Sequence, residues 1–333
     1  MDLQALPSLL RDAFQARRQL HDAGHQSALR LFSGFTEGCP DLVIDLYGET
    51  AVFHNYADVR SHGEALVQAA MEELRAELQW VQAGLVKARN SASADERRGR
   101  MAFGQQLTTR IREGDLWYAV DLTLHQDCSF YLDTRNLRKW ASEHLRDKTV
   151  LNTFAYTGSL GIAALGGGAR RVVQLDRTKR FLDLARTSCA LNGFLIQPAD
   201  FVHADFFREA GRLRRRNRAF DCVFLDPPFF ASGSTGVVDQ EAQSSRLINK
   251  VRPLIVHGGT LVAINNALYV SGHDYMQALE SLCADGYLRI RELIPIPEDF
   301  TGYPATRAGT PITDPGPFNS STKIAVLEVK RRV

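Results

Sequence analysis

One stretch of this sequence, Thr149–Gly161, constrains the fold more than any other part of the chain. It reads Thr-Val-Leu-Asn-Thr-Phe-Ala-Tyr-Thr-Gly-Ser-Leu-Gly, which predicts a buried strand that ends in a tight glycine turn and opens directly into a helix. Such a turn brings backbone N–H groups up to a ligand. The next predicted strand ends at Asp176, where a carboxylate can accept hydrogen bonds from both hydroxyls of a ribose. Together these elements predict a nucleoside ligand.

The alternation of strands and helices continues through residues 129–333. The predicted strands are Val150–Phe154, Arg171–Leu175, Asp200–His203, Phe220–Leu225, Thr260–Asn265, Tyr287–Ile294 and Lys323–Val329, and the predicted helices include Thr178–Leu191, Phe206–Arg216, Asp239–Val256 and His273–Ala284. This order predicts an α/β fold with a mostly parallel seven-stranded sheet and helices on both faces. Ligands of such sheets bind beyond the C-terminal ends of the strands.

The chain ahead of this region predicts a separate, smaller unit. Residues 1–27 form a helical segment, with an amphipathic helix over 3–23. Residues 28–128 predict a small α+β domain, with a hairpin that turns at Tyr47–Thr50, a helix over Gly63–Leu78 and a strand pair that turns at Glu113–Asp115. This part shows no catalytic constellation, so we expect it to contact or support the substrate.

Composition narrows the class of protein. With 44% hydrophobic and 23% charged residues the chain is globular, and no stretch resembles a signal peptide or a membrane span, so we expect a cytoplasmic protein without membrane contact. The 5 cysteines are scattered without metal-ligand spacing, which predicts reduced thiols and no metal site. The net charge of +2 argues neither for nor against binding of nucleic acid. Basic residues cluster within 87–100 and within 208–218, where they form either binding surfaces or solvated faces.

Polar and aromatic residues follow the ends of the predicted strands. The first strand is followed by a loop that lacks the GxGxxG spacing of a dinucleotide site. After the third strand, Asp205 and Phe206 could bind the edge of an adenine and stack on its face. A single aspartate at such a place can simply cap a helix, but polar residues at the tips of four successive predicted strands are harder to explain in that way. The candidates for binding the nucleoside are Asn152, Phe154, Tyr156, Thr157, Gly158, Asp176, Asp205, Phe206 and Asp226.

The tetrapeptide Asp226-Pro227-Pro228-Phe229 is the most specific signal in the chain. Two prolines cannot continue a central strand, and they fix a rigid extended turn at the predicted ligand edge. Such a turn can aim the Asp226 carboxylate and the Pro227 carbonyl at a flat nitrogenous ring while Phe229 stacks on its face. The alternative is a turn that only ends the strand.

These motifs resemble those of the class I S-adenosylmethionine-dependent methyltransferases, which have a Rossmann-like domain. The Phe154–Gly158 form of the first motif, with Gln126 and Phe130–Arg135 upstream, is similar to the subgroup that modifies bases of large-subunit ribosomal RNA. The resemblance implies S-adenosyl-L-methionine as cofactor and RNA as partner, and leaves a homodimer possible. It also implies that the upstream segment closes over the cofactor, which makes Phe130, Asp133 and Arg135 candidates for binding it; an ion pair with a purely structural role is the alternative for Asp133 and Arg135.

Two departures from this subgroup bear on the substrate. Members that methylate cytosine C5 usually carry an additional N-terminal RNA-binding module, for which the first 27 residues are too few. They also use a cysteine after the fifth strand, where this chain has Asn265-Asn266, and Cys222 is expected to be buried and inert inside the fourth strand. Asn265-Asn266 instead resembles the branch that methylates guanine N7, so Asp226, Pro227, Phe229 and Asn265 are the candidates for substrate alignment. A strand-end turn is the alternative role of Asn265.

Other functions stay open at this point. An exocyclic amine of guanine, cytosine C5, a protein or small-molecule substrate, and a non-catalytic nucleic-acid-binding module with the same fold are the alternatives. A long insertion over residues 298–322 is expected to be functional or disordered. Its aromatic residues Phe300, Tyr303 and Phe318, with Lys323, either line the substrate side of the site or pack onto the sheet.

Overall fold

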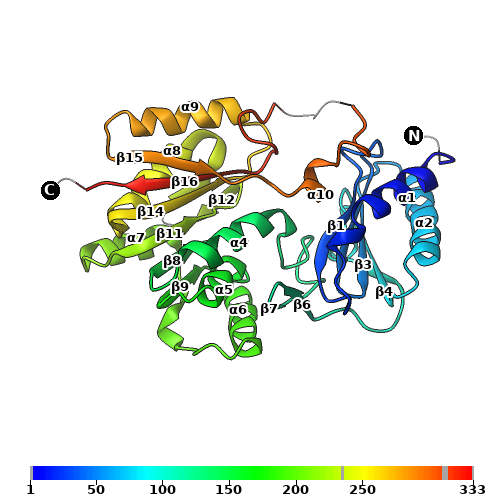
Figure 1. Ribbon diagram of the computed structural model, residues 1–333, viewed down its shortest axis with the longest axis horizontal. Helices are drawn as coiled ribbons and strands as arrows, with labels where there is room; N and C mark the ends of the chain where they lie inside the picture. The colour runs from blue at the N-terminus through cyan, green and yellow to red at the C-terminus, as the bar shows by residue number, and fades with distance from the viewer. Residues whose placement is uncertain (1–2, 234–235, 310–313, 332–333) are drawn as a thin grey trace. The chain divides into compact units, whose positions relative to one another are not determined.

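The computed structural model describes residues 3–233, 236–309 and 314–331. The chain forms two compact units (Figure 1). The first unit consists of Met1–Leu132 and Pro297–Ile312, and the second consists of Asp133–Ile296 and Thr313–Val333. The first unit therefore includes a segment that the sequence-based boundaries assign to the region 129–333. Within the described ranges, no helix has the length and apolar character needed to cross a membrane.

The second unit is built on a seven-stranded sheet, as the sequence predicts. Its strand order is β10-β9-β8-β11-β14-β16-β15. All neighbouring pairs from β10 to β14 are parallel, whereas β16 runs antiparallel to both of its neighbours. The strands are β8 (Thr149–Thr153), β9 (Arg171–Asp176), β10 (Phe201–His203), β11 (Phe220–Leu225), β14 (Ile255–Asn265), β15 (Leu288–Leu293) and β16 (Lys323–Val329). A short hairpin, β12 (Phe230–Gly233) and β13 (Gly236–Asp239), follows β11.

Helices cover both faces of this sheet, so the central strands are buried along nearly their whole length. The strands β8, β11 and β16 show no alternation between buried and exposed positions. The helices are α4 (Arg135–His144), α5 (Ser159–Gly166), α6 (Lys179–Leu191), α7 (Phe206–Arg215), α8 (Gln240–Val251) and α9 (Gly272–Cys283). One core joins strand residues such as Val223 and Leu261 to helix residues such as Ala210, Leu247 and Leu279.

The first unit is an α+β arrangement around a five-stranded sheet of order β1-β2-β3-β4-β5. Its elements are α1 (Leu6–Ala16), β1 (Ala28–Ser33), β2 (Leu42–Tyr47), β3 (Thr50–Asn55), α2 (Arg60–Glu77), β4 (Ala83–Ala88), α3 (Ala94–Arg98), β5 (Arg100–Phe103), β6 (Arg110–Glu113), β7 (Leu116–Ala119) and α10 (Glu298–Thr301). The helix α2 connects the parallel pair β3 and β4, and its Leu66, Ala70 and Leu74 are buried in the core. The strands β4 and β5 were not predicted.

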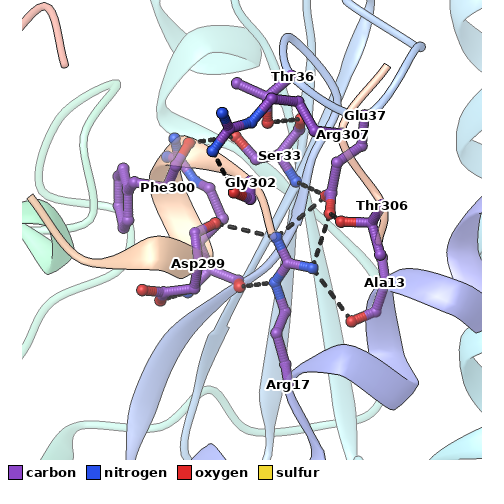
Figure 2. A network of polar contacts seen from close by, with 11 residues as sticks. Ala13, Arg17, Ser33, Thr36, Glu37, Asp299, Phe300, Gly302, Thr306 and Arg307 are labelled. Carbon is purple, nitrogen blue, oxygen red and sulfur yellow. Dashed lines mark hydrogen bonds and ion pairs between the residues drawn. The ribbon is translucent and has the colours of Figure 1, made fainter. Parts of the chain in front are cut away.

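A buried polar network ties the returning segment to the first unit (Figure 2). The guanidinium of Arg17 is fully buried and donates two hydrogen bonds to the carboxylate of Glu37, at 2.9 and 3.0 Å. It also donates to the carbonyl of Asp299 at 3.0 Å, and the Thr306 hydroxyl donates to Glu37. The backbone N–H of Ser33 donates to Glu37 at 2.8 Å. Because each charge has several partners, the network offsets the cost of burying the ion pair.

The aromatic residues of the long insertion pack within their own units. The Phe300 ring lies 3.8 Å from the Arg30 guanidinium carbon, and the Tyr303 ring lies 5.1 Å from that of Arg17. In the second unit Phe318 belongs to the hydrophobic core. The buried Lys323 ammonium donates to the carbonyls of Ala267, Val270 and Ser321, so it anchors the loop after β14. Packing is thus the observed role of these residues; residues 310–313 of the insertion lie outside the described part of the chain.

Candidate active site

Strand register brings the predicted candidates of the second unit to one edge of its sheet. Thr153 at the end of β8 pairs with Leu225 at the end of β11, and Leu225 pairs with Ala263 of β14. On the other side Asp176 of β9 pairs with His203 of β10. The strand ends at this edge, and the loops and the helix start that follow them, carry the candidates Phe154, Tyr156, Thr157, Gly158, Asp176, Asp205, Phe206, Asp226, Pro227, Phe229 and Asn265. The edge is where open parallel sheets bind ligands.

The loop after β8 has an unusual backbone. Phe154 and Tyr156 adopt positive φ angles of 53° and 51°, and Gly158 at the start of α5 has φ of 81°. A non-glycine residue in this region is strained, and such strain occurs mainly at functional sites. Thr157 between them is buried. The Tyr156 N–H donates to the Asp176 carboxylate at 2.9 Å, which holds the loop against the end of β9.

Asp176 is held by the backbone on both sides. Its second carboxylate oxygen accepts from the Thr178 N–H at 2.8 Å, just before α6 begins. Burial raises the pKa of Asp176 above its ordinary value, while these two backbone donors oppose the rise. Each carboxylate oxygen has a further lone pair. The group is therefore fixed in orientation and can still accept hydrogen bonds from a ligand.

A buried glutamine, Gln174, braces the glycine turn from the neighbouring strand β9. Its side-chain carbonyl accepts from the Asn152 amide at 2.8 Å, and its amide donates to the Gly158 carbonyl at 3.2 Å. A Cβ on Gly161 would lie 2.1 Å from the Gln174 amide nitrogen, so any larger residue there would displace the Gln174 side chain. The Asn152 Oδ1 is buried, and no described atom donates to it. Gln174 was missed, although a polar residue inside the apolar run of β9 was a visible signal.

The aromatic residues next to this turn contact other aromatic rings of the second unit. The Phe154 ring lies 4.5 Å from that of Phe206, at an interplanar angle of 34°. The Tyr156 ring meets Phe181 edge-on, also at 4.5 Å. The Asp205 carboxylate accepts from the Arg208 N–H at 3.0 Å, so it caps α7. Asp205 thus has the helix-capping role that the sequence left open as its alternative.

The turn after β11 combines an unusual carboxyl group with an exposed ring. Burial, with a smaller effect from the nearby Asp133 carboxylate, raises the pKa of Asp226 to about 7. Pro227 is buried, whereas Phe229 is 42% exposed. Asp133 is positioned by the Thr322 hydroxyl, which donates to it at 2.9 Å. Arg135 lies at the start of α4, two residues after Asp133.

Asn265 is buried at the end of β14. Its Oδ1 accepts from the Ala267 N–H at 3.0 Å, which closes a turn and gives the side chain the structural role weighed for it. The next residues of this loop, Leu268 and Tyr269, are 59% and 81% exposed. An isolated Leu-Tyr pair carries no sign of exposure in the sequence, so neither residue could be predicted as part of the site.

Phe130 and Cys222 were also singled out by the sequence. Phe130 belongs to the first unit, where it is buried, its ring lies 5.0 Å from that of Tyr118, and its carbonyl accepts from the Tyr47 hydroxyl at 3.1 Å. Cys222 is fully buried in β11 as predicted, and burial strongly raises the pKa of its thiol. The described residues contain no group of histidine, cysteine and carboxylate side chains that could hold a metal ion.

The sheet order and the glycine turn after its central strand define a class I methyltransferase fold, and comparison with known proteins agrees. Residues 71–304 match the family described as S-adenosylmethionine-dependent methyltransferase. The chain belongs to this family, and its cofactor is S-adenosylmethionine. The strained loop after β8, the oriented Asp176 carboxylate and the buried Asn152 oxygen lie in the part of the second unit where the sequence predicts the cofactor site.

Relatives of known name give more detail. The chain is 30% identical over 251 residues to the ribosomal RNA large subunit methyltransferase I of Alteromonas mediterranea, an alignment that covers 75% of this chain and 61% of the relative. It is 33% identical over 231 residues to the protein of the same name from Photobacterium profundum, which covers 69% of this chain and 56% of the relative. The chain thus spans about three fifths of the length of the curated relatives that it matches.

Solved structures share the fold at lower identity. A methyltransferase named SMU.776, in complex with SAH, superposes with a TM-score of 0.84 at 22% identity, over 99% of this chain and 82% of the other. The tRNA m1G37 methyltransferase of M. jannaschii superposes with a TM-score of 0.55 at 14% identity, over 98% of this chain and 79% of the other. These similarities concern the fold.

Proposed function

We propose that the protein transfers a methyl group from S-adenosylmethionine to a base of RNA, with a guanine of large-subunit ribosomal RNA as the substrate. The observation that carries this proposal is the turn after β11, where a carboxyl with a raised pKa stands three residues from an exposed phenylalanine. A carboxylate can accept the N–H groups of a base while an aromatic ring stacks on its face. The names of the relatives support ribosomal RNA, and with it a cytoplasmic protein.

The residues around the glycine turn would hold the cofactor. Asp176 is assigned to the ribose hydroxyls, because its carboxylate is oriented by two backbone donors. Phe206 and Asp205 are assigned to the adenine, and the Asn152 Oδ1 offers a buried acceptor in the same region. Asp133 and Arg135, at the start of α4, are assigned to the amino-acid end of the cofactor. Thr157 and Gly158 in the turn complete the set.

Methyl transfer to guanine N7 requires mainly that the protein align the reacting atoms. When bound, S-adenosylmethionine supplies a methyl group on a positively charged sulfur. Guanine N7 presents an in-plane lone pair, so the N–CH3 bond forms as the S–CH3 bond breaks and no proton has to leave. The protein holds the reacting atoms in line. Transfer leaves a positive charge on the purine, and the Asp226 carboxylate stabilises that charge at short range.

Two other base positions make different demands. Attack by cytosine C5 needs a thiolate that adds to the ring. All five cysteines lie in the described part of the chain, four of them are buried, and the loops at the strand-end edge contain none. An exocyclic amine of guanine must lose a proton, which the Asp226 carboxylate could accept with help from the Pro227 carbonyl. This amine is the second candidate, because the pKa of about 7 suits a general base.

The test is transfer of a labelled methyl group to large-subunit ribosomal RNA. Asp226→Ala should abolish transfer and leave cofactor affinity, measured by calorimetry, within about tenfold, because Asp226 is assigned to the substrate. Asp183→Asn on α6, an exposed carboxylate paired with Arg186, is the control that should keep both properties. Normal turnover of Asp226→Ala would remove this residue from the mechanism. Absence of any heat with S-adenosylmethionine would favour a non-catalytic module, and label in protein or a small molecule would favour those substrates.

A further inference from the structure

A basic pocket lies in the second unit, away from the loops that carry the candidate active site. Its volume is about 660 Å³, and five cationic side chains line it together with a single carboxylate. The cations are Arg214, Arg218, Arg252, Lys330 and Arg331, and the carboxylate is Asp285. The pocket therefore carries a large excess of positive charge.

Topology places this pocket at the edge of the sheet where the parallel strands begin. Arg218 precedes β11 by two residues, and Arg252 lies in the short turn before β14. Arg331 follows the end of β16, which is antiparallel to β14, so it reaches the same edge. The candidate active site lies at the opposite ends of these strands. The six residues of β11 alone separate the two edges by about 20 Å.

The charges in the pocket are only partly neutralised. Arg252 lies 3.4 Å from Asp285. Arg331 is anchored by backbone carbonyls, with its Nε donating to Ile255 at 2.6 Å and its Nη2 to Pro253 at 2.7 Å. These bonds orient its guanidinium without cancelling its charge. Arg214 and Arg218 are exposed, and within the described ranges neither forms an ion pair or a side-chain hydrogen bond.

Arginines in this arrangement fit phosphate groups. A guanidinium presents a planar fork of donors that matches the oxygens of phosphate, and it keeps its charge at all physiological pH values. The volume is large enough for more than one phosphate group. The five lining cations come from separate segments of the chain around this volume. A polymer with regularly spaced phosphates fits such a spread of positive charge better than one small anion does.

We infer that this pocket binds the sugar-phosphate backbone of the RNA substrate, at a point about 20 Å or more from the nucleotide that is methylated. The inference rests on the proposed function for the identity of the polymer. Phosphate contacts of this kind fix register and orientation and read no base. The pocket would therefore strengthen binding of long RNA and would not touch the transfer step.

The experiment compares two double variants of equal charge change. Arg214→Gln with Arg218→Gln removes the unpaired cations of the pocket, whereas Arg215→Gln with Arg216→Gln removes two exposed cations of the same segment that do not line it. Affinity for a ribosomal RNA fragment of roughly 30 nucleotides is measured over a salt series by fluorescence anisotropy. Loss of two phosphate contacts should weaken binding about tenfold at 0.15 M salt and reduce the salt slope by about 1.4. The control pair should change affinity less than threefold.

Further readings separate the possible outcomes. Both variants should bind S-adenosylmethionine like the unchanged protein, which shows that they are folded. Equal weakening by both pairs would mean general electrostatics and would overturn the pocket. Affinity that is unchanged in the pocket variant also overturns it. Tight binding of tripolyphosphate that is lost in the pocket variant, with RNA affinity unaltered, assigns the pocket to a small anion instead. If the unchanged protein neither binds nor methylates RNA, the proposed function has failed as well.

Discussion

The pH dependence of methyl transfer is the property that the geometry around Asp226 determines most directly. The pKa of this carboxyl is raised to about 7, chiefly by burial and in part by Asp133. If the carboxylate is the active form, kcat/KM should rise with pH through about 7, because the pH dependence of kcat/KM reports the pKa values of groups in the free enzyme. About half of the groups are ionised at pH 7 and about 1% at pH 5, so the expected loss between these values is roughly 50-fold.

Variants of Asp226 and Asp133 show whether the pH dependence of the rate comes from the Asp226 carboxyl. Initial rates are measured with labelled S-adenosylmethionine below saturation, from pH 5 to pH 9. Asp226→Asn should be slow and should lack the rise near pH 7. Asp133→Asn should move the midpoint to lower pH, because a neighbouring negative charge is removed. A rate that falls as pH rises, or an Asp226→Asn profile that still rises near pH 7, would refute the reasoning.

The same raised pKa affects stability without cofactor. A carboxyl whose pKa is higher in the folded than in the unfolded state contributes stability that is present below the unfolded value and lost as pH rises through about 7. Unfolding by urea should therefore show the ligand-free second unit losing stability as the pH rises from about 4, the unfolded pKa of an aspartate, to about 7, and Asp226→Asn should reduce this loss. A positively charged cofactor favours the ionised carboxylate, so the loss should be smaller in its presence.

Two more substitutions test separate parts of the structure. Arg17→Met should reduce the free energy of unfolding of the first unit by about 3 to 5 kcal/mol, because it leaves the buried Glu37 carboxylate without its cation. The control Arg11→Met removes an exposed pair with Glu73 and should reduce the free energy of unfolding by about 1 kcal/mol or less. Equal losses for the two variants in urea titrations would contradict the role of burial. Asp176→Ala should weaken S-adenosylmethionine binding by about 1.5 to 3 kcal/mol through lost ribose hydrogen bonds, and unchanged affinity in calorimetry would exclude that assignment.

The sheet of the second unit was predictable from sequence because local pattern and tertiary environment agree. Each strand is a short apolar run bounded by turn residues, and the polar residues that follow the runs of β8, β9 and β11 mark one edge of the sheet. Register then brings distant residues such as Asp176 and Asp226 to that edge. The glycine turn could be recognised because Gly158 and Gly161 are required there by backbone conformation and close packing.

Features that depend on partners far away in sequence could not be predicted. The strand β4 contains Gly84 and Lys87, both poor strand formers, and it is defined by pairing with β3 and β5. Lys87 is nevertheless fully buried and donates to the His125 carbonyl at 2.8 Å. The return of 297–312 to the first unit rests on the contact of Arg17 with Asp299, which are far apart in the chain.

The identity of the methylated nucleotide shows whether this protein methylates RNA and at which base position. Large-subunit ribosomal RNA that lacks base modifications is incubated with the protein and isotope-labelled S-adenosylmethionine, digested to nucleosides and analysed by mass spectrometry. We expect label in N7-methylguanosine, at a single position, and none with Asp226→Ala. Label at C5 of cytidine would contradict the substrate assignment, and the absence of label from all RNA nucleosides would contradict RNA methylation itself.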